Sequence, residues 1–389
     1  MKKSLFIFLF CVACGISAVA EIQSIWPLPE PVRKYDKNND NLLSGEEITE
    51  KLSRLDLNND SIVTPSEALF VFSKEHFEKE RPDYKAPIFD SVNVNQENHG
   101  FKNTILISMD GFDRAIVKKL LDSNKIPALR KIARMYSEED AVVNLTLTGH
   151  KTETKTGHAV MLTALIPEYS LVQTNRYFQP IPKGYTIFER IKNYDSKIKT
   201  VFVSSKHENV GAMTAEELGN REEFGMKILG GPYLNAKESM DVFSDSDKTS
   251  EQAKECFLKA MEIVKDSRFF AFLHFRSPDK EGHAFGRESK EYRDAVIKTD
   301  SCIAEILEFL KSNNIDKTTR IIITADHGFN PDASHHQYAP WITMITNDST
   351  LLTSKTPSLF DIPATIMSSF GIDLEKLNPK PFGKNIAEF

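Results

Sequence analysis

From about residue 102 onward, short apolar segments alternate with longer amphipathic segments, and this alternation constrains the possible fold more than any other feature. The apolar segments predict strands at 104–109, 199–204, 269–275, 320–325 and 341–346. The amphipathic segments predict helices at 114–122, 126–136, 186–194, 250–265, 289–312 and 357–370. Strands that alternate with helices form a mostly parallel sheet covered by helices on both faces. The sequence therefore predicts an α/β fold.

The N-terminal twenty residues have the pattern of a secretory signal peptide. Two lysines follow Met1, residues 5–14 are apolar, and Ala18-Val-Ala20 provides small residues for cleavage. The apolar core is too short to span a bilayer, and no later segment is long and apolar enough to do so. We expect a secreted or periplasmic protein that begins at Glu21. A lipoprotein cleaved before Cys14 is a minor alternative.

The composition and the remaining segments suggest how the chain is organised. We expect a small module at 30–74, a charged, turn-rich linker at 75–101 and a catalytic domain at 102–389, in which residues 207–248 form an insertion or lid. The net charge of −6, with dispersed basic residues, gives no indication of a nucleic-acid surface. Cys256 and Cys302 remain after cleavage and form either a disulfide or two buried thiols. No sequence feature indicates the oligomeric state.

Two twelve-residue segments repeat one pattern of oxygen-bearing side chains at positions 1, 3, 5, 9 and 12. The first contains Asp36, Asn38, Asp40, Ser44 and Glu47, and the second contains Asp56, Asn58, Asp60, Thr64 and Glu67. Calcium prefers hard oxygen ligands on a flexible loop that a bidentate Glu closes. We expect the apolar eighth residues, Leu43 and Val63, to pair as a short β contact.

These loops resemble the EF-hand family in its short tandem form. The resemblance implies a small α-helical module that binds Ca²⁺. Position 6 departs from the family, because Asn41 and Ser61 stand where the family prefers Gly. Asn adopts the left-handed backbone conformation more readily than Ser, so we expect weaker binding in the second loop.

Residue types that bind metals follow several of the predicted strands. The candidates are Asp110, Asp279, His283, Asp326, His327 and His336. Chemistry in open α/β sheets gathers at the carboxyl ends of strands, so we expect these side chains to meet. Asp279 and His283 are one helical turn apart and can face one metal. Carboxylate and imidazole ligands without thiolate favour Zn²⁺, with Mn²⁺ or Fe as substitutes. The set predicts a two-metal hydrolytic centre.

The segment Thr152–His158 is expected to be a loop that enters a helix. The first amides of a helix favour an anion, and a hydroxyl held at a metal there becomes nucleophilic. Thr154 is therefore the candidate nucleophile. Considered singly, Thr154 is an ordinary helix cap and His158 a core histidine.

Together, in this order, the motifs resemble the alkaline phosphatase superfamily, and within it the type I phosphodiesterase/nucleotide pyrophosphatase group. The resemblance spans about 103–375. It is carried by Met109-Asp-Gly-Phe112, Thr154-Lys-Thr-Gly-His158, Asp279-Lys-Glu-Gly-His283, Ala325-Asp-His-Gly328 and His336-Gln-Tyr-Ala-Pro340. Thr156 replaces the Pro of the family's Thr-x-Pro-x-His motif.

The resemblance implies two zinc sites and a covalent mechanism. One zinc would be held by Asp279, His283 and His336, with His335 as the rival of His336. The other would be held by Asp110, Asp326, His327 and the Thr154 oxygen. Two in-line displacements through a phosphothreonine are implied, and Asn175 matches an Asn that hydrogen-bonds a non-bridging phosphoryl oxygen.

The same resemblance narrows the substrate to a small-molecule phosphate ester. Sulfatases of the superfamily need Cys or Ser where this chain has Thr154, and Arg where it has His158. Thr-dependent monoesterases use a Lys-x-Arg pair, whereas here Glu208 follows Lys206 at that spacing. An acidic residue repels a dianion, which favours diesters, with Lys206 as a substrate-binding residue. A phosphomonoesterase or phosphonate hydrolase, and a catalytically silent calcium-dependent binding protein, remain alternatives.

Overall fold

The computed structural model describes residues 24, 26–57, 59–69, 71–72, 100–137, 140–146, 152–330, 333–336, 339, 341–353 and 355–389. The predicted signal peptide, most of the predicted linker at 75–101 and Asn58 of the second loop lie outside the described residues. Among the helices of the described part, none is both long and apolar enough to cross a bilayer.

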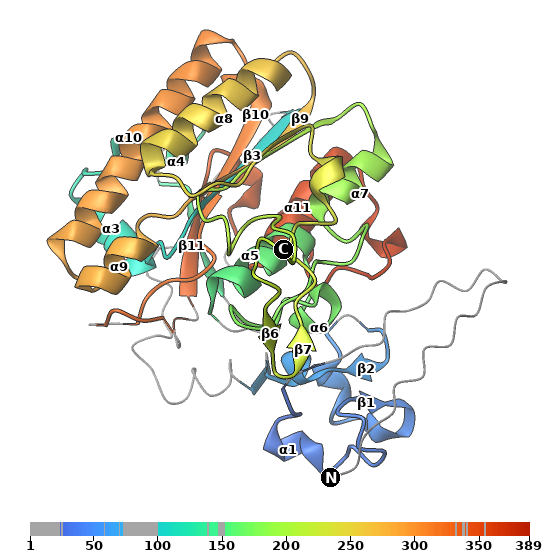
Figure 1. Cartoon of the computed structure of the whole chain (residues 1–389). Coiled ribbons are helices and arrows are strands. Elements are labelled where there is room, and N and C mark those ends of the chain that lie inside the picture. Colours follow the sequence, from blue (N-terminus) through green and yellow to red (C-terminus); the bar gives the residue numbers. More distant parts are fainter. Residues whose placement is uncertain are drawn as a thin grey trace.

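A seven-stranded sheet forms the centre of the larger domain (Figure 1), in the order β4-β11-β10-β3-β9-β5-β8. The strands are β3 (Asn103–Met109), β4 (Val142–Thr146), β5 (Lys199–Val203), β8 (Val242–Ser244), β9 (Phe269–Phe275), β10 (Thr319–Thr324) and β11 (Trp341–Thr346). The pairs from β10 to β8 are parallel, and β11 runs antiparallel to both of its neighbours. The expectation of a mostly parallel sheet is confirmed.

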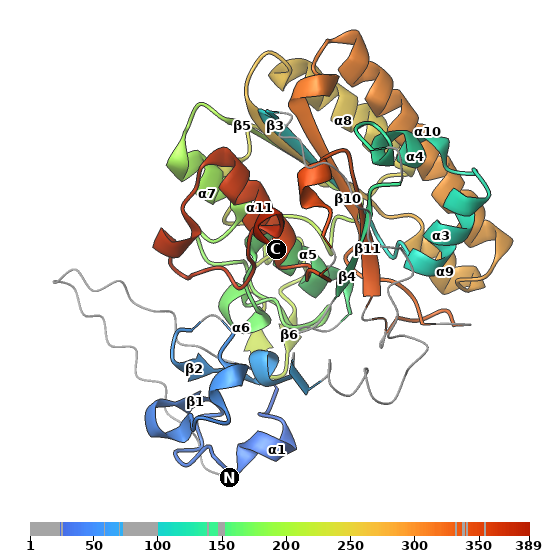
Figure 2. The same ribbon diagram turned by 180° about the vertical axis from the view of Figure 1, so that it is seen from behind.

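Helices cover both faces of this sheet (Figures 1 and 2). One layer groups around α10 and contains α3 (Arg114–Asp122), α4 (Pro127–Ala133), α8 (Ser250–Val264), α9 (Asp279–Phe285) and α10 (Lys290–Ser312). The other layer contains α5 (Thr154–Thr163), α6 (Pro167–Ser170), α7 (Ile187–Tyr194) and α11 (Asp361–Phe370). Every residue of β3 and β9 is buried, because helices cover both faces of these central strands.

Some predicted elements differ from the observed ones. The helix expected at 357–370 begins only at Asp361, because the Leu359 amide donates to the Thr146 carbonyl and extends the chain beside β4. Strands β4 and β8 were not predicted, and β8 lies inside the expected insertion at 207–248. That segment also contains the hairpin of β6 (Glu222–Glu223) and β7 (Met226–Lys227). Cys256 and Cys302 are free thiols, and Cys302 is the more buried of the two.

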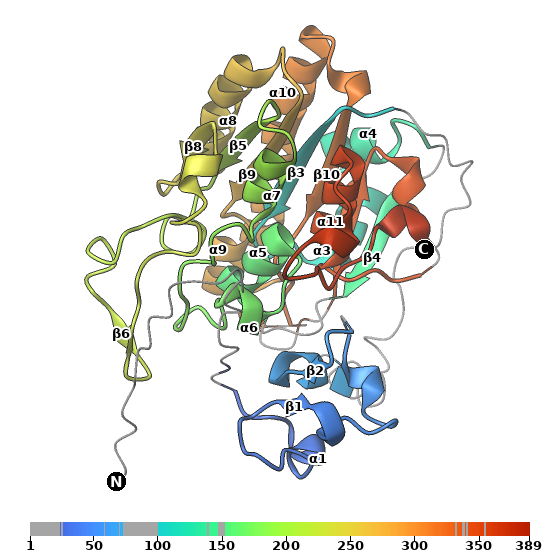
Figure 3. The ribbon, with the colours of Figure 1, turned by 90° about the vertical axis from the view of Figure 1, so that its right-hand side faces the viewer.

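The N-terminal module has a small hydrophobic core of its own. Its elements include α1 (Glu30–Arg33), β1 (Leu43–Ser44), a 3₁₀ turn at Gly45–Glu47, another at Ser53–Leu55, and β2 (Ile62–Val63), and residues 65–69 are also helical. The core consists of Leu28, Val32, Leu43, Leu52, Leu55, Val63 and Ala68. Helical segments in its described residues are short. The module lies next to α6 in all three views (Figure 3).

Candidate metal centre

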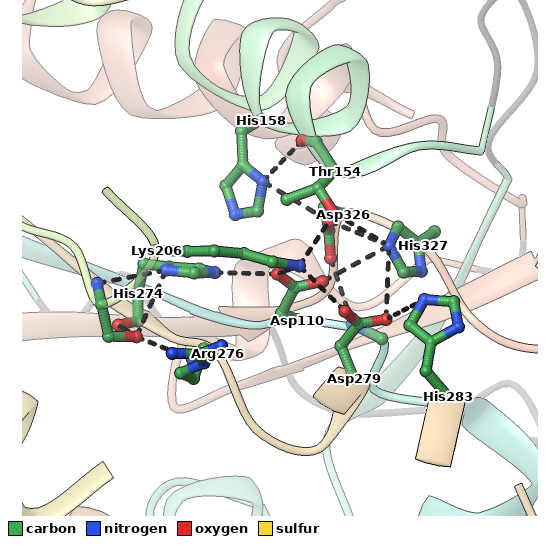
Figure 4. A network of polar contacts seen from close by, with 12 residues as sticks. Asp110, Thr154, His158, Lys206, His274, Arg276, Asp279, His283, Asp326 and His327 are labelled. Atoms are coloured by element: carbon green, nitrogen blue, oxygen red, sulfur yellow. Dashed lines mark hydrogen bonds and ion pairs between the residues drawn. The ribbon is translucent and has the colours of Figure 1, made fainter. Parts of the chain in front are cut away.

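The predicted metal ligands that Figure 4 labels meet at one edge of the sheet. Asp110 directly follows β3, and Asp326 and His327 come just after β10. Asp279 is the first residue of α9, which starts shortly after β9, and His283 lies one turn further along that helix. Thr154 is the first residue of α5. Because β3, β9 and β10 are parallel neighbours, their carboxyl ends bring these residues together.

Asp279, His283 and His336 form the first group of candidate ligands. Asp279 Oδ1 lies 3.3 Å from His283 Nε2, which lies 3.2 Å from His336 Nε2. The Nδ1 of His283 lies 2.8 Å from the Ser334 carbonyl, and that of His336 meets the Thr152 carbonyl. An imidazole that donates Nδ1–H to a carbonyl leaves Nε2 free as a metal ligand. Both rings therefore present their Nε2 atoms to one point.

His335, the rival of His336, lies elsewhere. Its Nδ1 is 2.9 Å from the Asn330 side-chain amide, and the residue is exposed. His336 instead stacks on His327, with ring centroids 3.7 Å apart. The structure brings His336 into the ligand group and leaves His335 outside it.

The second group surrounds His327 Nε2, which lies 3.3 Å from Asp110 Oδ1, 3.3 Å from Asp326 Oδ2 and 3.4 Å from Thr154 Oγ1. All four residues are buried. Within the described part of the chain, Asp110 Oδ1, Asp326 Oδ2 and the nearby Asp279 Oδ1 are buried and make no hydrogen bond, although imidazole Nε2 atoms lie 3.3 Å from each of them. Buried carboxylate oxygens without a partner are costly, so this donor set fits divalent cations.

Lys206 enters the centre from the segment that follows β5. Its Nζ donates to Asp110 Oδ2 and Asp279 Oδ2, both at 2.8 Å, and to Thr154 Oγ1 at 3.2 Å. Burial lowers the pKa of Lys206, but the two carboxylates outweigh burial and raise that pKa. Burial raises the pKa of Asp110, but Lys206, His274 and His327 hold it well below its usual range. The ammonium group thus neutralises part of the carboxylate charge.

Asn175 lies beside the start of α5. Its side-chain oxygen accepts the Lys155 backbone N–H at 2.9 Å, and its own backbone N–H donates to the Glu153 carboxylate. Asn175 therefore contacts the residues on either side of Thr154, which are Glu153 and Lys155.

Glu208, on which the charge argument for diesters rests, is already paired. It lies 2.9 Å from Arg221 Nη1 and 3.7 Å from Lys155 Nζ. Lys155 is 1% exposed at its side chain, and burial lowers its pKa to about 8. The negative charge of Glu208 is compensated by neighbouring cations, so its repulsion of a dianion is weaker than the sequence alone indicates.

The type I phosphodiesterase / nucleotide pyrophosphatase family model matches residues 104–369, a range that includes every candidate ligand of the centre. The chain belongs to this family.

Its similarity to individual family members is moderate. It is 28% identical to an uncharacterised pyrophosphatase/phosphodiesterase of Schizosaccharomyces pombe, over 65% of this chain and 50% of that protein. It is 23% identical to human ectonucleotide pyrophosphatase/phosphodiesterase family member 1, over 61% of this chain and 25% of that protein. The chain thus spans half or less of these relatives. A structure from work on glycosaminoglycan metabolism by Bacteroides thetaiotaomicron shares the fold, with a TM-score of 0.51, 14% identity, and coverage of 73% of this chain and 75% of that chain.

Two residues of this family member support the centre without having been predicted as part of it. His274, near the end of β9, is fully buried, and its Nε2 lies 3.2 Å from Asp110 Oδ2. Its signal in the sequence was a single imidazole in the otherwise apolar strand Phe269–Phe275. A Cβ added to Gly157 would lie 2.4 Å from the Asp326 carbonyl oxygen, so Gly157 allows α5 to approach the ligand segment. His158 packs as a core histidine, 2.9 Å from Ser108 Oγ.

The two N-terminal loops have matching internal hydrogen bonds. The amides of Asn41 and Ser61, both at position 6, each donate at 3.0 Å to the carboxylate at position 1 of their own loop. Both residues have φ of +67°, the conformation for which the family prefers Gly. Position 12 closes each loop in the same way: Glu47 and Glu67 accept the amides at positions 2 and 9.

The eighth residues of the two loops pair as the sequence suggested. Leu43 lies opposite Val63 in the antiparallel pair of β1 and β2. Among the other predicted loop ligands, Asp40 accepts the Asn38 side-chain amide at 2.9 Å, Ser44 precedes the first 3₁₀ turn, and Thr64 Oγ1 donates to Glu67 at 3.0 Å.

Proposed function

We propose that this chain is a secreted two-metal phosphoric ester hydrolase of the phosphodiesterase/nucleotide pyrophosphatase type. Its substrates would be small-molecule phosphodiesters or pyrophosphates. The observation that carries the proposal is the position of the Thr154 hydroxyl. Thr154 is the first residue of α5, and its Oγ1 lies 3.4 Å from His327 Nε2 and 3.2 Å from Lys206 Nζ. A hydroxyl so close to a ligand group, a cation and a helix N-terminus suits nucleophilic attack on phosphorus.

Two zinc ions, or Mn²⁺ or Fe in their place, fit the two ligand groups. Asp279, His283 and His336, which form one compact group, would hold one. Asp110, Asp326, His327 and Thr154 would hold the other, and the Asp279 carboxylate also lies close to Asp110 and His327. When bound, the metals would supply positive charge that lowers the pKa of the Thr154 hydroxyl and of water, and that stabilises the transferred phosphoryl group.

The protein groups would then act in two steps. Thr154 Oγ attacks phosphorus, the bond to the leaving oxygen breaks, and a phosphothreonine forms. Lys206 and the Asn175 amide would contact the non-bridging oxygens, whose negative charge increases in the transition state. Water then attacks phosphorus, and the bond to Thr154 Oγ breaks, which restores the free hydroxyl.

Hydrolysis of bis-p-nitrophenyl phosphate by the mature chain with zinc tests this proposal. We expect Thr154→Ala to lower kcat by at least ~10³-fold, as for removal of other nucleophiles. Thr154→Ser keeps a hydroxyl and should retain part of the activity. The control is Thr156→Ser, because the Thr156 hydroxyl donates to the Glu153 carbonyl. If the Thr154→Ala variant hydrolyses the diester at the wild-type rate, the phosphothreonine mechanism is excluded.

A phosphomonoesterase or phosphonate hydrolase is the second candidate. It is favoured by the cations that surround Glu208, namely Lys155 and Arg221. A comparison of kcat/KM for bis-p-nitrophenyl phosphate, p-nitrophenyl phosphate and a phenylphosphonate ester separates the candidates. A protein that binds calcium but hydrolyses none of these esters with zinc, manganese or iron would instead be a catalytically silent binding protein.

We also propose that both N-terminal loops bind Ca²⁺. Their matched closure by Glu47 and Glu67 and the Leu43–Val63 pairing support this. Equilibrium dialysis with calcium at a fixed zinc concentration tests it, and Glu47→Gln and Glu67→Gln should each remove binding at one loop.

Export of the chain is a separate proposal, which rests on the pattern of residues 1–20. N-terminal sequencing of the exported protein should find Glu21 as the first residue. A lipid-modified Cys14 would identify the lipoprotein alternative.

A further inference from the structure

The second calcium-type loop contacts the catalytic domain directly. Tyr169 Oη donates to Asp60 Oδ2 of the loop. Ser66 donates to Glu168 Oε1 twice, from its backbone N–H at 3.2 Å and from its hydroxyl at 2.8 Å. Ser66 and Glu168 are buried, with 4% and 2% of their surfaces exposed. The docking contact consists of Asp60, Ser66, Glu168 and Tyr169.

On the module side, both residues of the docking contact belong to the ligand loop. Asp60 is at position 5, and its other oxygen, Oδ1, accepts the Ile62 amide at 2.8 Å. Ser66 directly precedes Glu67, the residue that closes the loop. Glu67 accepts the Leu57 amide at 3.0 Å and the Thr64 amide at 2.8 Å. A cation bound by Asp60 and Glu67 would therefore restrain both halves of the docking contact.

On the catalytic side, Glu168 and Tyr169 lie in α6, which three residues connect to α5. Every residue of α5 is buried, and Thr154 is its first residue. Tyr169 also packs on Phe382, with ring centroids 6.0 Å apart. Because densely packed elements shift as units, the position of α6 is coupled to that of α5 and of the Thr154 hydroxyl.

We propose that calcium in the second loop holds the module on α6 and thereby positions the helix that carries Thr154. The role of calcium is then to activate the hydrolase from outside the zinc centre. This inference rests on the proposed calcium binding. The proposed coupling must also act in both directions. If bound calcium strengthens the docking contact, then the docking contact must strengthen calcium binding by the same factor.

The test uses the mature full-length chain in calcium-free buffer with a fixed, saturating zinc concentration. Calcium is titrated by calorimetry, hydrogen exchange is followed at residues 165–172, and hydrolysis of bis-p-nitrophenyl phosphate is measured in parallel. The variants are Tyr169→Phe and Ser66→Ala, each of which removes one hydroxyl from the docking contact. Tyr194→Phe, at a 53% exposed tyrosine on α7, is the control.

We expect calcium to slow exchange at 165–172 and to raise kcat in the wild type. Tyr169→Phe should weaken calcium binding by about three- to tenfold, the value of one hydrogen bond of ordinary net strength. It should lower calcium activation, and Tyr194→Phe should match the wild type.

The possible failures are distinguishable. If calcium binds both docking variants as tightly as the wild type and leaves exchange at 165–172 unchanged, the coupling is wrong while the calcium sites stand. If the wild type binds no calcium, the calcium sites and the coupling are both wrong, and zinc-dependent hydrolysis is unaffected. If calcium protects 165–172 but no ester is hydrolysed, the docking stands and the proposed catalysis is wrong.

Discussion

Replacement of Lys206 by Met should have opposite effects on the metal-free protein and on metal binding. The Lys206 ammonium lies 2.8 Å from one oxygen of Asp110 and 2.8 Å from one oxygen of Asp279. Each attraction is about 6 kcal/mol at an effective dielectric constant of ~20, and desolvation offsets most of it. Removal of one partner from a buried ion pair costs about 3–5 kcal/mol. We therefore expect the metal-free variant to be less stable by about 4 kcal/mol.

Zinc should restore most of this stability, because it neutralises the same carboxylates. Zinc should also bind the variant more tightly, by at least ~10-fold, since a competing positive charge has been removed. Urea unfolding of the metal-free and zinc-loaded proteins measures the first effect, and zinc titration against a chelating dye measures the second. Lys206→Met should raise KM if the ammonium also contacts substrate.

Lys248→Met is the matched control. Lys248 is buried and Lys206 is largely covered, but the Lys248 ammonium donates to the Ser204 and Ser246 carbonyls, at 3.0 and 2.9 Å, instead of to carboxylates. Its loss should destabilise both forms equally and leave zinc affinity unchanged. If Lys206→Met behaves like this control, or changes neither quantity, Lys206 does not compensate the charge of the candidate metal-binding carboxylates.

Two further predictions address the surroundings of the centre, and a third addresses Asp241, which directly precedes β8. His274→Ala should lower zinc affinity or kcat by about 10–100-fold, because Asp110 loses the imidazole that orients it, and His274→Gln should restore part of the loss. Gly157→Ala should lower both kcat and the melting temperature, because its new methyl group would lie 2.4 Å from the Asp326 carbonyl oxygen; circular dichroism and the diester assay measure both. Burial raises the pKa of Asp241, but two lysines and Thr200 outweigh it and hold that pKa at about 2. The resulting stabilisation of about 2 kcal/mol is present above pH ~4 and is lost as the pH falls towards 2. Urea midpoints at pH 7 and pH 3 should therefore differ more for the wild type than for Asp241→Asn.

The elements that the sequence predicted well are those with many apolar residues. The strands predicted at 269–275 and 341–346 and the helix at 114–122 have the observed bounds. The short edge strand β8 was not predicted, since it has only three residues, all partly exposed. It forms because β5 offers it a parallel partner, and such long-range pairing leaves no periodic signal in a short segment.

The candidate site shows a similar division. Each predicted carboxylate ligand could be located because it follows an apolar strand, and parallel strands bring such positions to one edge. The sequence could not decide whether His336 or His335 is the ligand, because the two side chains differ in the direction in which they point. His336 meets His283, whereas His335 meets Asn330. Nor could it place Lys206 between Asp110 and Asp279, because no local pattern records a contact between segments so far apart.

The sequence by itself determined the fold class, the chemical types in the centre and the repeat of the two N-terminal loops, because periodicity and spacing are local properties. The tertiary structure decided which atoms face one another. Among the described residues of the candidate centre, it left three buried carboxylate oxygens without a hydrogen bond. It also paired Glu208 with Arg221 and set the second loop against α6. These features arise only when segments distant in the chain pack together, since burial and charge compensation depend on neighbours in space.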